Sequence, residues 1–159
     1  MGSYMMSKSD ETRQLGEQEE KTLPQLAARN GKLTDAQEKA LSVYKSSVPD
    51  RLRVIFPDKS VKVFNTLHPQ LVIGRRTRNN YGQVDVDMSP FDDGVQGVSR
   101  IHAVIVPETS GLVIKDMQST NGTFINSRQL MPVQSYPLAH GDKVKVGNLR
   151  LELHFEYND

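Results

Sequence analysis

The chain has 159 residues and a formal net charge of +1, so its length suits one domain of common size with an appendage. It contains no cysteine, which excludes disulfides, thiolate metal sites and cysteine nucleophiles. Its four histidines lie without metal-ligand spacing, so we expect no metal and no other cofactor. Because no apolar run reaches the length of a membrane span and nothing resembles a secretory signal, we expect a cytoplasmic protein.

Residues 1–32 form a polar segment that we expect to be a disordered tail. The segment holds an acidic cluster at Glu17, Glu19 and Glu20 and few apolar residues. Such a composition cannot bury enough apolar surface to offset the entropy lost on folding.

Residues 33–48 carry the pattern of a short helix followed by a linker. Thr34 precedes Gln37 by three positions, which is the spacing of a capping box, and an apolar stripe follows. Pro49 lacks a backbone N–H and ends the predicted helix.

From Arg51 onward, short apolar segments are separated by turn residues. The clearest segment begins at Leu149, where apolar residues alternate with charged or polar ones, so one face enters a core and the other meets water. The segment before it, Lys143–Val146, is joined to it by Gly147-Asn148, a two-residue link that permits positive φ at a tight hairpin. Many short strands without helices between them predict an all-β antiparallel sandwich or barrel.

Three polar clusters lie at the ends of predicted strands, where a sandwich gathers its loops. They are Gly74-Arg75, Ser99-Arg100 with His102, and Asp116–Asn126. The third is a run of small polar residues longer than a hairpin turn needs, because Asn-Gly alone suffices to reverse a strand. The reversal of a strand therefore does not explain this run.

Taken together, the clusters make this sequence resemble the forkhead-associated domain, a phosphothreonine-binding β-sandwich. The resemblance covers residues 51–157 and rests on motifs in the family's order: Gly74-Arg75, Ser99-x-x-His102, Asp116-x-x-Ser119-Thr120-Asn121-Gly122-Thr123 with Ile125-Asn126, and "LAHGDKVKVG". It implies an eleven-stranded antiparallel β-sandwich, preceded by the polar tail and one short α-helix. Loops at one end of the sandwich would bind a phosphorylated peptide without catalysis.

The resemblance also implies a role for each matched residue. Phosphothreonine carries about −1.5 to −2 charges and three acceptor oxygens, so its receptor needs a guanidinium fork with hydroxyl or amide donors. The implied phosphopeptide-binding residues are Arg75, Ser99, Arg100, Thr120 and Asn121. Four others are expected to support the loops: Gly74 by close backbone packing, Gly122 by positive φ, and His102 and Asn126 by hydrogen bonds.

Residues 81–97 depart from short members of the family through an extra loop. The loop contains Asp92, Asp93 and Gly94. We expect the two carboxylates to be solvated at the surface, and the selectivity for residues after the phosphothreonine is not implied by the resemblance.

A hydrolase is one alternative, because Ser99, His102 and Asp116 have the side chains of a catalytic triad. The serine and the histidine lie three residues apart at a strand start, so they would face opposite ways if both are extended. No Gly-x-Ser-x-Gly elbow is present either. We therefore expect a binding module without enzymatic activity.

A nucleic-acid binder is the second alternative. It would use the basic residues Arg75, Arg76, Arg78, Lys143 and Lys145. The nearly neutral net charge and the lack of an aromatic platform among these residues count against it.

The expected partner is a threonine-phosphorylated protein, such as a Ser/Thr kinase or its substrate, in phosphorylation-dependent signalling. Neither nucleic acid nor a membrane is expected as a partner. Thr22 follows the acidic cluster in the tail. If a kinase modified it, the tail would compete for the pocket at a high effective concentration, within one molecule or between two.

Overall fold

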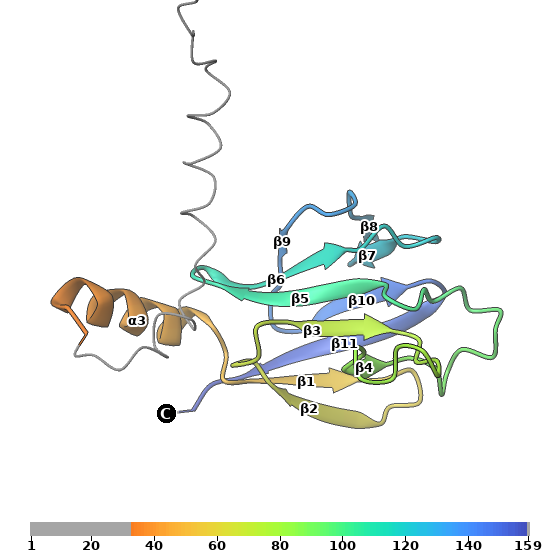
Figure 1. Cartoon of the computed structure of the whole chain (residues 1–159), viewed down its shortest axis with the longest axis horizontal. Coiled ribbons are helices and arrows are strands. Elements are labelled where there is room, and N and C mark those ends of the chain that lie inside the picture. The colour runs from red at the N-terminus through yellow and green to blue at the C-terminus, as the bar shows by residue number, and fades with distance from the viewer. Residues whose placement is uncertain (1–32, 159) are drawn as a thin grey trace, which may run out of the picture. The chain divides into compact units, whose positions relative to one another are not determined.

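The computed structural model describes residues 33–158 (Figure 1). The predicted disordered tail at 1–32 lies outside this range.

The predicted helix is confirmed as α3 (Asp35–Ser47). Its start is a capping box: the Gln37 N–H donates to Thr34 Oγ1 at 3.3 Å, and the Thr34 N–H donates to Gln37 Oε1 at 2.9 Å. The helix ends at Ser47, immediately before the buried Val48 and Pro49. Within residues 33–158, no helix combines the length and the apolar character that a membrane crossing requires.

In the part of the chain that the structure describes, eleven strands form two sheets, whose arrangement is seen in Figure 1. The six-stranded sheet has the order β2 (Val61–Asn65), β1 (Arg51–Ile55), β11 (Leu149–Glu156), β10 (Asp142–Val146), β7 (Thr123–Ile125), β8 (Arg128–Gln129). The five-stranded sheet has the order β4 (Val86–Asp87), β3 (Leu71–Gly74), β5 (Ala103–Glu108), β6 (Gly111–Asp116), β9 (Tyr136–Pro137).

The all-β sandwich predicted from the alternating pattern is confirmed. In β11, Leu149, Leu151 and Leu153 are buried while the polar residues between them are half-buried or exposed. The pairing is antiparallel except for the short β3–β4 pair, which is parallel. This exception is possible because the connection at 75–85 carries the chain back before β4 pairs.

The β10–β11 hairpin has the predicted two-residue link, with Val146 opposite Leu149. Gly147 has φ +57°, and a Cβ at this position would lie 2.3 Å from the carbonyl oxygen of Gln96. Glycine is therefore needed both for the turn and for its close approach to the loop before β5. The Asn148 N–H donates to the same carbonyl at 2.8 Å, so the turn is fixed to that loop.

Candidate functional site

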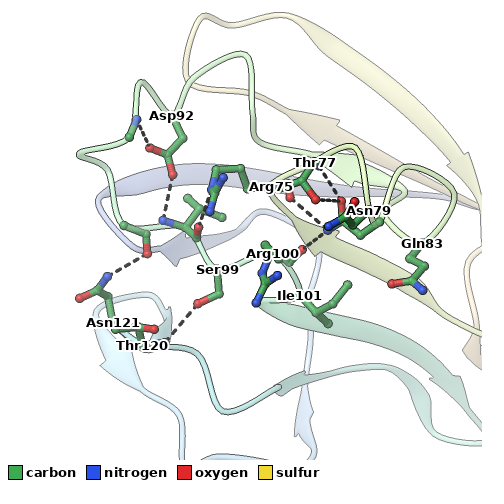
Figure 2. A pocket seen from close by; sticks show the side chains of 14 residues that line it. Arg75, Thr77, Asn79, Gln83, Asp92, Ser99, Arg100, Ile101, Thr120 and Asn121 are labelled. Atoms are coloured by element: carbon green, nitrogen blue, oxygen red, sulfur yellow. Dashed lines mark hydrogen bonds between the residues drawn. The ribbon is translucent and has the colours of Figure 1, made fainter.

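A pocket of about 790 Å³ lies among three loops. The loops follow β3, precede β5 and precede β7, and their side chains are seen together in Figure 2. All five predicted binding residues line it: Arg75, Ser99, Arg100, Thr120 and Asn121. Segments far apart in the sequence thus meet at one site.

Arg75 is held at the pocket by backbone contacts. Its N–H donates to the Ser99 carbonyl at 3.1 Å, and its Nε donates to the Val98 carbonyl at 3.3 Å. A Cβ at Gly74 would lie 2.1 Å from the carbonyl oxygen of Arg100, so only glycine lets these two backbones lie so close. The Nε bond uses one donor of the guanidinium and neither terminal nitrogen, which together form the fork that suits a phosphate.

Ser99 and Thr120 join two of the loops. The Thr120 N–H donates to Ser99 Oγ at 3.2 Å. A hydroxyl that accepts a hydrogen bond still has its own proton to donate, so Ser99 keeps a donor for a ligand. Thr120 is exposed, and Arg100 is exposed beside Ser99.

Asn121 packs against Gly97 across the pocket. Its Nδ2 donates to the Gly97 carbonyl at 2.9 Å. Gly97 has φ +75°, and a Cβ there would lie 2.3 Å from Asn121 Nδ2. The amide is therefore fixed in place, while its oxygen is an acceptor suited to a peptide N–H.

His102 lies beneath the pocket and is completely buried. Its Nδ1 accepts from the Ser99 N–H at 3.0 Å, so Nε2 carries the proton and donates to the Gly122 carbonyl at 2.9 Å. Burial lowers the pKa of His102 and outweighs the opposing effects of the Gly122 carbonyl and the charge of Asp116. The neutral ring that both bonds require is therefore the favoured form.

These bonds are not those of a catalytic triad. Both ring nitrogens of His102 bind backbone groups, and the Ser99 hydroxyl binds the Thr120 N–H. A serine nucleophile needs its hydroxyl bonded to the histidine base, so this geometry does not support the hydrolase alternative.

Asp116 anchors the loop before β7, a role that sequence reasoning missed. It is 2% exposed, and its carboxylate accepts from the Ser119 N–H at 3.1 Å, from Ser119 Oγ at 2.5 Å and from the buried Thr123 Oγ1 at 2.6 Å. An aspartate three residues before a serine is a local signal for this kind of bond. The polar run is thus held from below by one carboxylate.

Asn80 is a second support that sequence reasoning missed. It is buried, its Oδ1 accepts from the backbone and side chain of Thr77, and its Nδ2 donates to the carbonyls of Arg75 and Arg100. It therefore ties the loop after β3 to the segment before β5. The sequence offers only an Asn-rich turn as a signal, since its partners are backbone groups.

The expectation that Asp92 is merely solvated was wrong. Its carboxylate accepts from the N–H groups of Gly94 at 2.9 Å, Gln96 at 3.2 Å and Val98 at 3.0 Å. Burial opposes its ionisation, but these bonds and the charge of Arg75 hold the pKa of Asp92 below its ordinary value. An aspartate two residues before a glycine is a turn signal that would have indicated this role. Asp93 is exposed, as expected.

The remaining predicted supports lie outside the pocket lining. Gly122 has φ +81° and accepts the His102 bond, in keeping with its expected conformation. Asn126 lies farther along: its Nδ2 donates to Asp142 Oδ1 at 2.8 Å, and its Oδ1 accepts from the Lys143 N–H at 2.9 Å. It fixes the end of β7 to β10. The supporting roles of both residues in ligand binding stay predictions.

Residues 71–147 match the family model of the FHA domain, that is, the forkhead-associated domain. A solved structure described as "Structural and functional analysis of phosphothreonine-dependent FHA domain interactions" is similar over 68% of this chain and 99% of its own, with a TM-score of 0.52 and 25% identity. The chain carries a forkhead-associated domain.

Two curated relatives are also similar to this chain. Protein FraH of Nostoc sp. is 41% identical over 63 residues, which are 40% of this chain and 22% of FraH. The ABC transporter ATP-binding/permease protein Rv1747 of Mycobacterium tuberculosis is 33% identical over 128 residues, which are 80% of this chain and 12% of that protein. The chain therefore spans about a fifth or less of the length of these relatives.

Proposed function

We propose that the pocket binds a peptide through a phosphorylated threonine and so mediates phosphorylation-dependent interactions between proteins. The observation that carries the proposal is the convergence of Arg75, Ser99, Thr120 and Asn121, from three loops, on one pocket. A doubly charged tetrahedral anion is the ligand that a guanidinium fork beside hydroxyl and amide groups suits best. The phosphothreonine-dependent interactions of the similar solved structure support this proposal.

Each group has a part in the proposed complex. The fork of Arg75 binds two phosphate oxygens, and the Ser99 hydroxyl donates its proton to a third. Arg100 adds positive charge beside them. Asn121 binds the main chain of the peptide, which positions the residues that flank the phosphothreonine.

The charge of the pocket also favours an anion. Its lining contains two arginines, Arg75 and Arg100, and one carboxylate, Asp92. The Asp92 carboxylate already accepts three backbone N–H groups of its own loop, which compensate part of its charge.

Calorimetry with phosphothreonine peptides, first selected from an oriented peptide library, tests the proposal. We expect Arg75→Ala to cost about 2 to 5 kcal/mol of binding free energy, because the buried part of the phosphate charge loses its main partner. Arg78→Ala is the matched control, since Arg78 is exposed and does not line the pocket. Unchanged affinity in Arg75→Ala, or equal binding of the unphosphorylated peptide, would contradict the proposal. A steep salt dependence of oligonucleotide binding without peptide binding would favour a nucleic-acid binder instead.

We propose 51–157 as the limits of the domain. The family match begins at residue 71, but β1 pairs with both β2 and β11 in the same sheet. A fragment lacking β1 and β2 would leave β11 at a sheet edge.

The proposed partner is a threonine-phosphorylated protein, such as a Ser/Thr kinase or its substrate, and the cytoplasmic location stays a prediction. Thr22 lies outside the described residues, so its occupation of the pocket also stays a prediction. Stoichiometric phosphorylation of Thr22 should weaken the binding of an external phosphopeptide through competition. Equal affinity before and after that modification would refute it.

A further inference from the structure

A second, smaller groove of about 190 Å³ lies on the six-stranded sheet. It is formed by β7, β10 and β11, and its lining residues are Phe124, Asn126, Ser127, Lys143, Val144, Lys145 and Arg150. Three of these side chains are cations and none is a carboxylate. We refer to this site as the basic groove.

The register of the sheet places like charges side by side in the basic groove. Lys145 lies directly opposite Arg150 on β11 and directly opposite Phe124 on β7. Like charges in such cross-strand positions are unfavourable. Among residues 33–158, the ion pairs involve Arg53, Arg76 and His154, so no carboxylate pairs with Lys145 or Arg150.

Lys143 differs from these two cations because it lies opposite Glu152. The hydrogen bond of His154 is the largest cause that lowers the pKa of Glu152, and the charge of Lys143 contributes as well. Among the cations of the groove, Lys145 and Arg150 are therefore the two that have no carboxylate opposite them or in an ion pair. Departures from local pairing rules without an evident structural gain are found preferentially at functional sites.

The β10–β11 turn, which follows Lys145 and precedes Arg150 of the basic groove, is bonded to the loop that lines the pocket. The Asn148 N–H donates to the Gln96 carbonyl, and the next residue, Gly97, lines the pocket. Lys145 and Arg150 each lie two residues from this turn, or roughly 7 Å along a strand. A peptide that leaves the pocket past Gly97 therefore reaches both cations within a few residues.

We propose that the basic groove binds acidic side chains of the same ligand, a few residues from its phosphothreonine. This inference rests on the proposed function and narrows the ligand class to phosphothreonine peptides with an acidic flank. The groove suits a peptide better than a nucleic acid, because Lys145 Nζ lies 4.6 Å from the centroid of the Phe124 ring and covers the surface on which a base would stack.

The test uses one phosphothreonine core peptide with a run of glutamates added before or after it, and with glutamines in the same positions. One of the two placements of the glutamates, before or after the phosphothreonine core, should bring them to the groove. At low salt, that glutamate peptide should bind about threefold to tenfold more tightly than its glutamine counterpart, as two or three exposed ion pairs allow. The advantage should shrink as salt rises, because exposed charges are screened. Equal affinity of the wild-type protein for all glutamate and glutamine peptides would overturn the inference.

Variants of the groove locate the effect. Lys145→Gln and Arg150→Gln should each reduce the glutamate advantage and leave the affinity for the glutamine peptide unchanged. Lys39→Gln, on the exposed surface of α3, removes the same charge and should preserve the full advantage. An advantage that persists in both groove variants would overturn the assignment to this groove.

Two further outcomes are distinguishable. If the glutamine peptide binds tightly but the glutamates add nothing, the phosphothreonine pocket stands and only the groove assignment fails. If no phosphopeptide binds at all, the proposed function fails and this inference fails with it. Oligonucleotide binding that depends on Lys145 and Arg150, with no effect of peptide glutamates, would replace the acidic peptide with a nucleic acid as the occupant.

Discussion

The pocket is built from two layers that differ in exposure and in how their polar groups are used. The rim consists of Arg75, Ser99, Arg100, Thr120 and Asn121, which are exposed or half-buried and line the pocket. The brace consists of Asn80, His102, Asp116 and Thr123, which are buried; of these four only Asn80 also lines the pocket. Polar groups of the brace are bonded to other parts of the protein, whereas the rim presents donors and acceptors to a ligand.

The difference indicates that stability and binding are assigned to separate layers. A buried polar group that loses its partner costs about 1 to 3 kcal/mol, whereas most exposed substitutions change stability by less than about 0.5 kcal/mol. Variants of the rim should therefore weaken binding in a protein that is still folded. Variants of the brace should weaken both.

The largest effect on folding should come from Asp116→Ala. The substitution leaves Ser119 and the buried Thr123 without their acceptor, and we expect a loss of about 3 kcal/mol in the free energy of unfolding. Phosphopeptide binding should fall as well, because the loop that carries Thr120 and Asn121 is no longer held. Chemical denaturation followed by calorimetry measures both quantities.

Two controls sharpen this comparison. Asp93→Ala removes an exposed carboxylate of the neighbouring loop and should change the unfolding free energy by less than about 0.5 kcal/mol. Arg75→Ala should also change the unfolding free energy by less than about 0.5 kcal/mol, but the variant should lose most of its affinity for the phosphopeptide. If Asp116→Ala and Arg75→Ala lowered the unfolding free energy and the phosphopeptide affinity in the same proportion, the separation into two layers would be wrong.

Gly74→Ala should have an intermediate effect at the boundary between the layers. The added Cβ would lie 2.1 Å from the Arg100 carbonyl oxygen, and Gly74 belongs to β3, whose backbone is paired with β5. We expect a loss of about 2 kcal/mol in unfolding free energy, as for an overpacked site. Gly82→Ala is the control, because nothing lies within 4 Å of a Cβ there. A thermal shift of equal size in both variants would show that the close approach has no energetic consequence.

The smallest effect should be the pH dependence that His102 contributes. Burial holds the pKa of His102 below its ordinary value of 6.5, so the unfolded chain takes up the proton more readily than the folded one. The stability that the neutral His102 contributes is therefore fully present above the pKa of the unfolded chain. It is lost as the pH falls from there toward the lower pKa of the folded protein, by at most about 1.4 kcal/mol per pH unit. Denaturant titrations at several pH values between about 7.5 and about 5.5 give the unfolding free energy at each pH. This free energy should change less steeply with pH for His102→Gln than for the wild type. If the unfolding free energies of both proteins changed equally with pH, the pKa of His102 would be the same in the folded and unfolded states, and burial would not lower it.

Much of the architecture was predictable because its causes are local in the sequence. Alternation of apolar and polar residues identified β11, and Thr34 with Gln37 identified the start of α3. The residues of the rim were located for a different reason: their types and order match the motifs of one family, and the structure brings them to one pocket. A resemblance to a family could therefore locate them.

The parts that escaped prediction depend on contacts that no residue pattern encodes. Asn80 binds the carbonyls of Arg75 and Arg100, and any residue has a carbonyl, so the sequence carries no sign of the pairing. The parallel β3–β4 pair depends on the path of the 75–85 connection. Asp92 is an intermediate case: its bond to the Gly94 N–H follows a local turn pattern, but its bond to the Val98 N–H depends on how the loop folds back.

The bonds of Asp92 also bear on how quickly the protein would exchange the proposed partners. Because this side chain already gathers the N–H groups of residues 94, 96 and 98, the loop has a defined conformation before any ligand arrives. A receptor of this kind pays little entropy to order itself, and differences in affinity between ligands then appear mainly in their dissociation rates. The residence time of a phosphorylated partner would be set by the contacts it makes at the rim and in the basic groove.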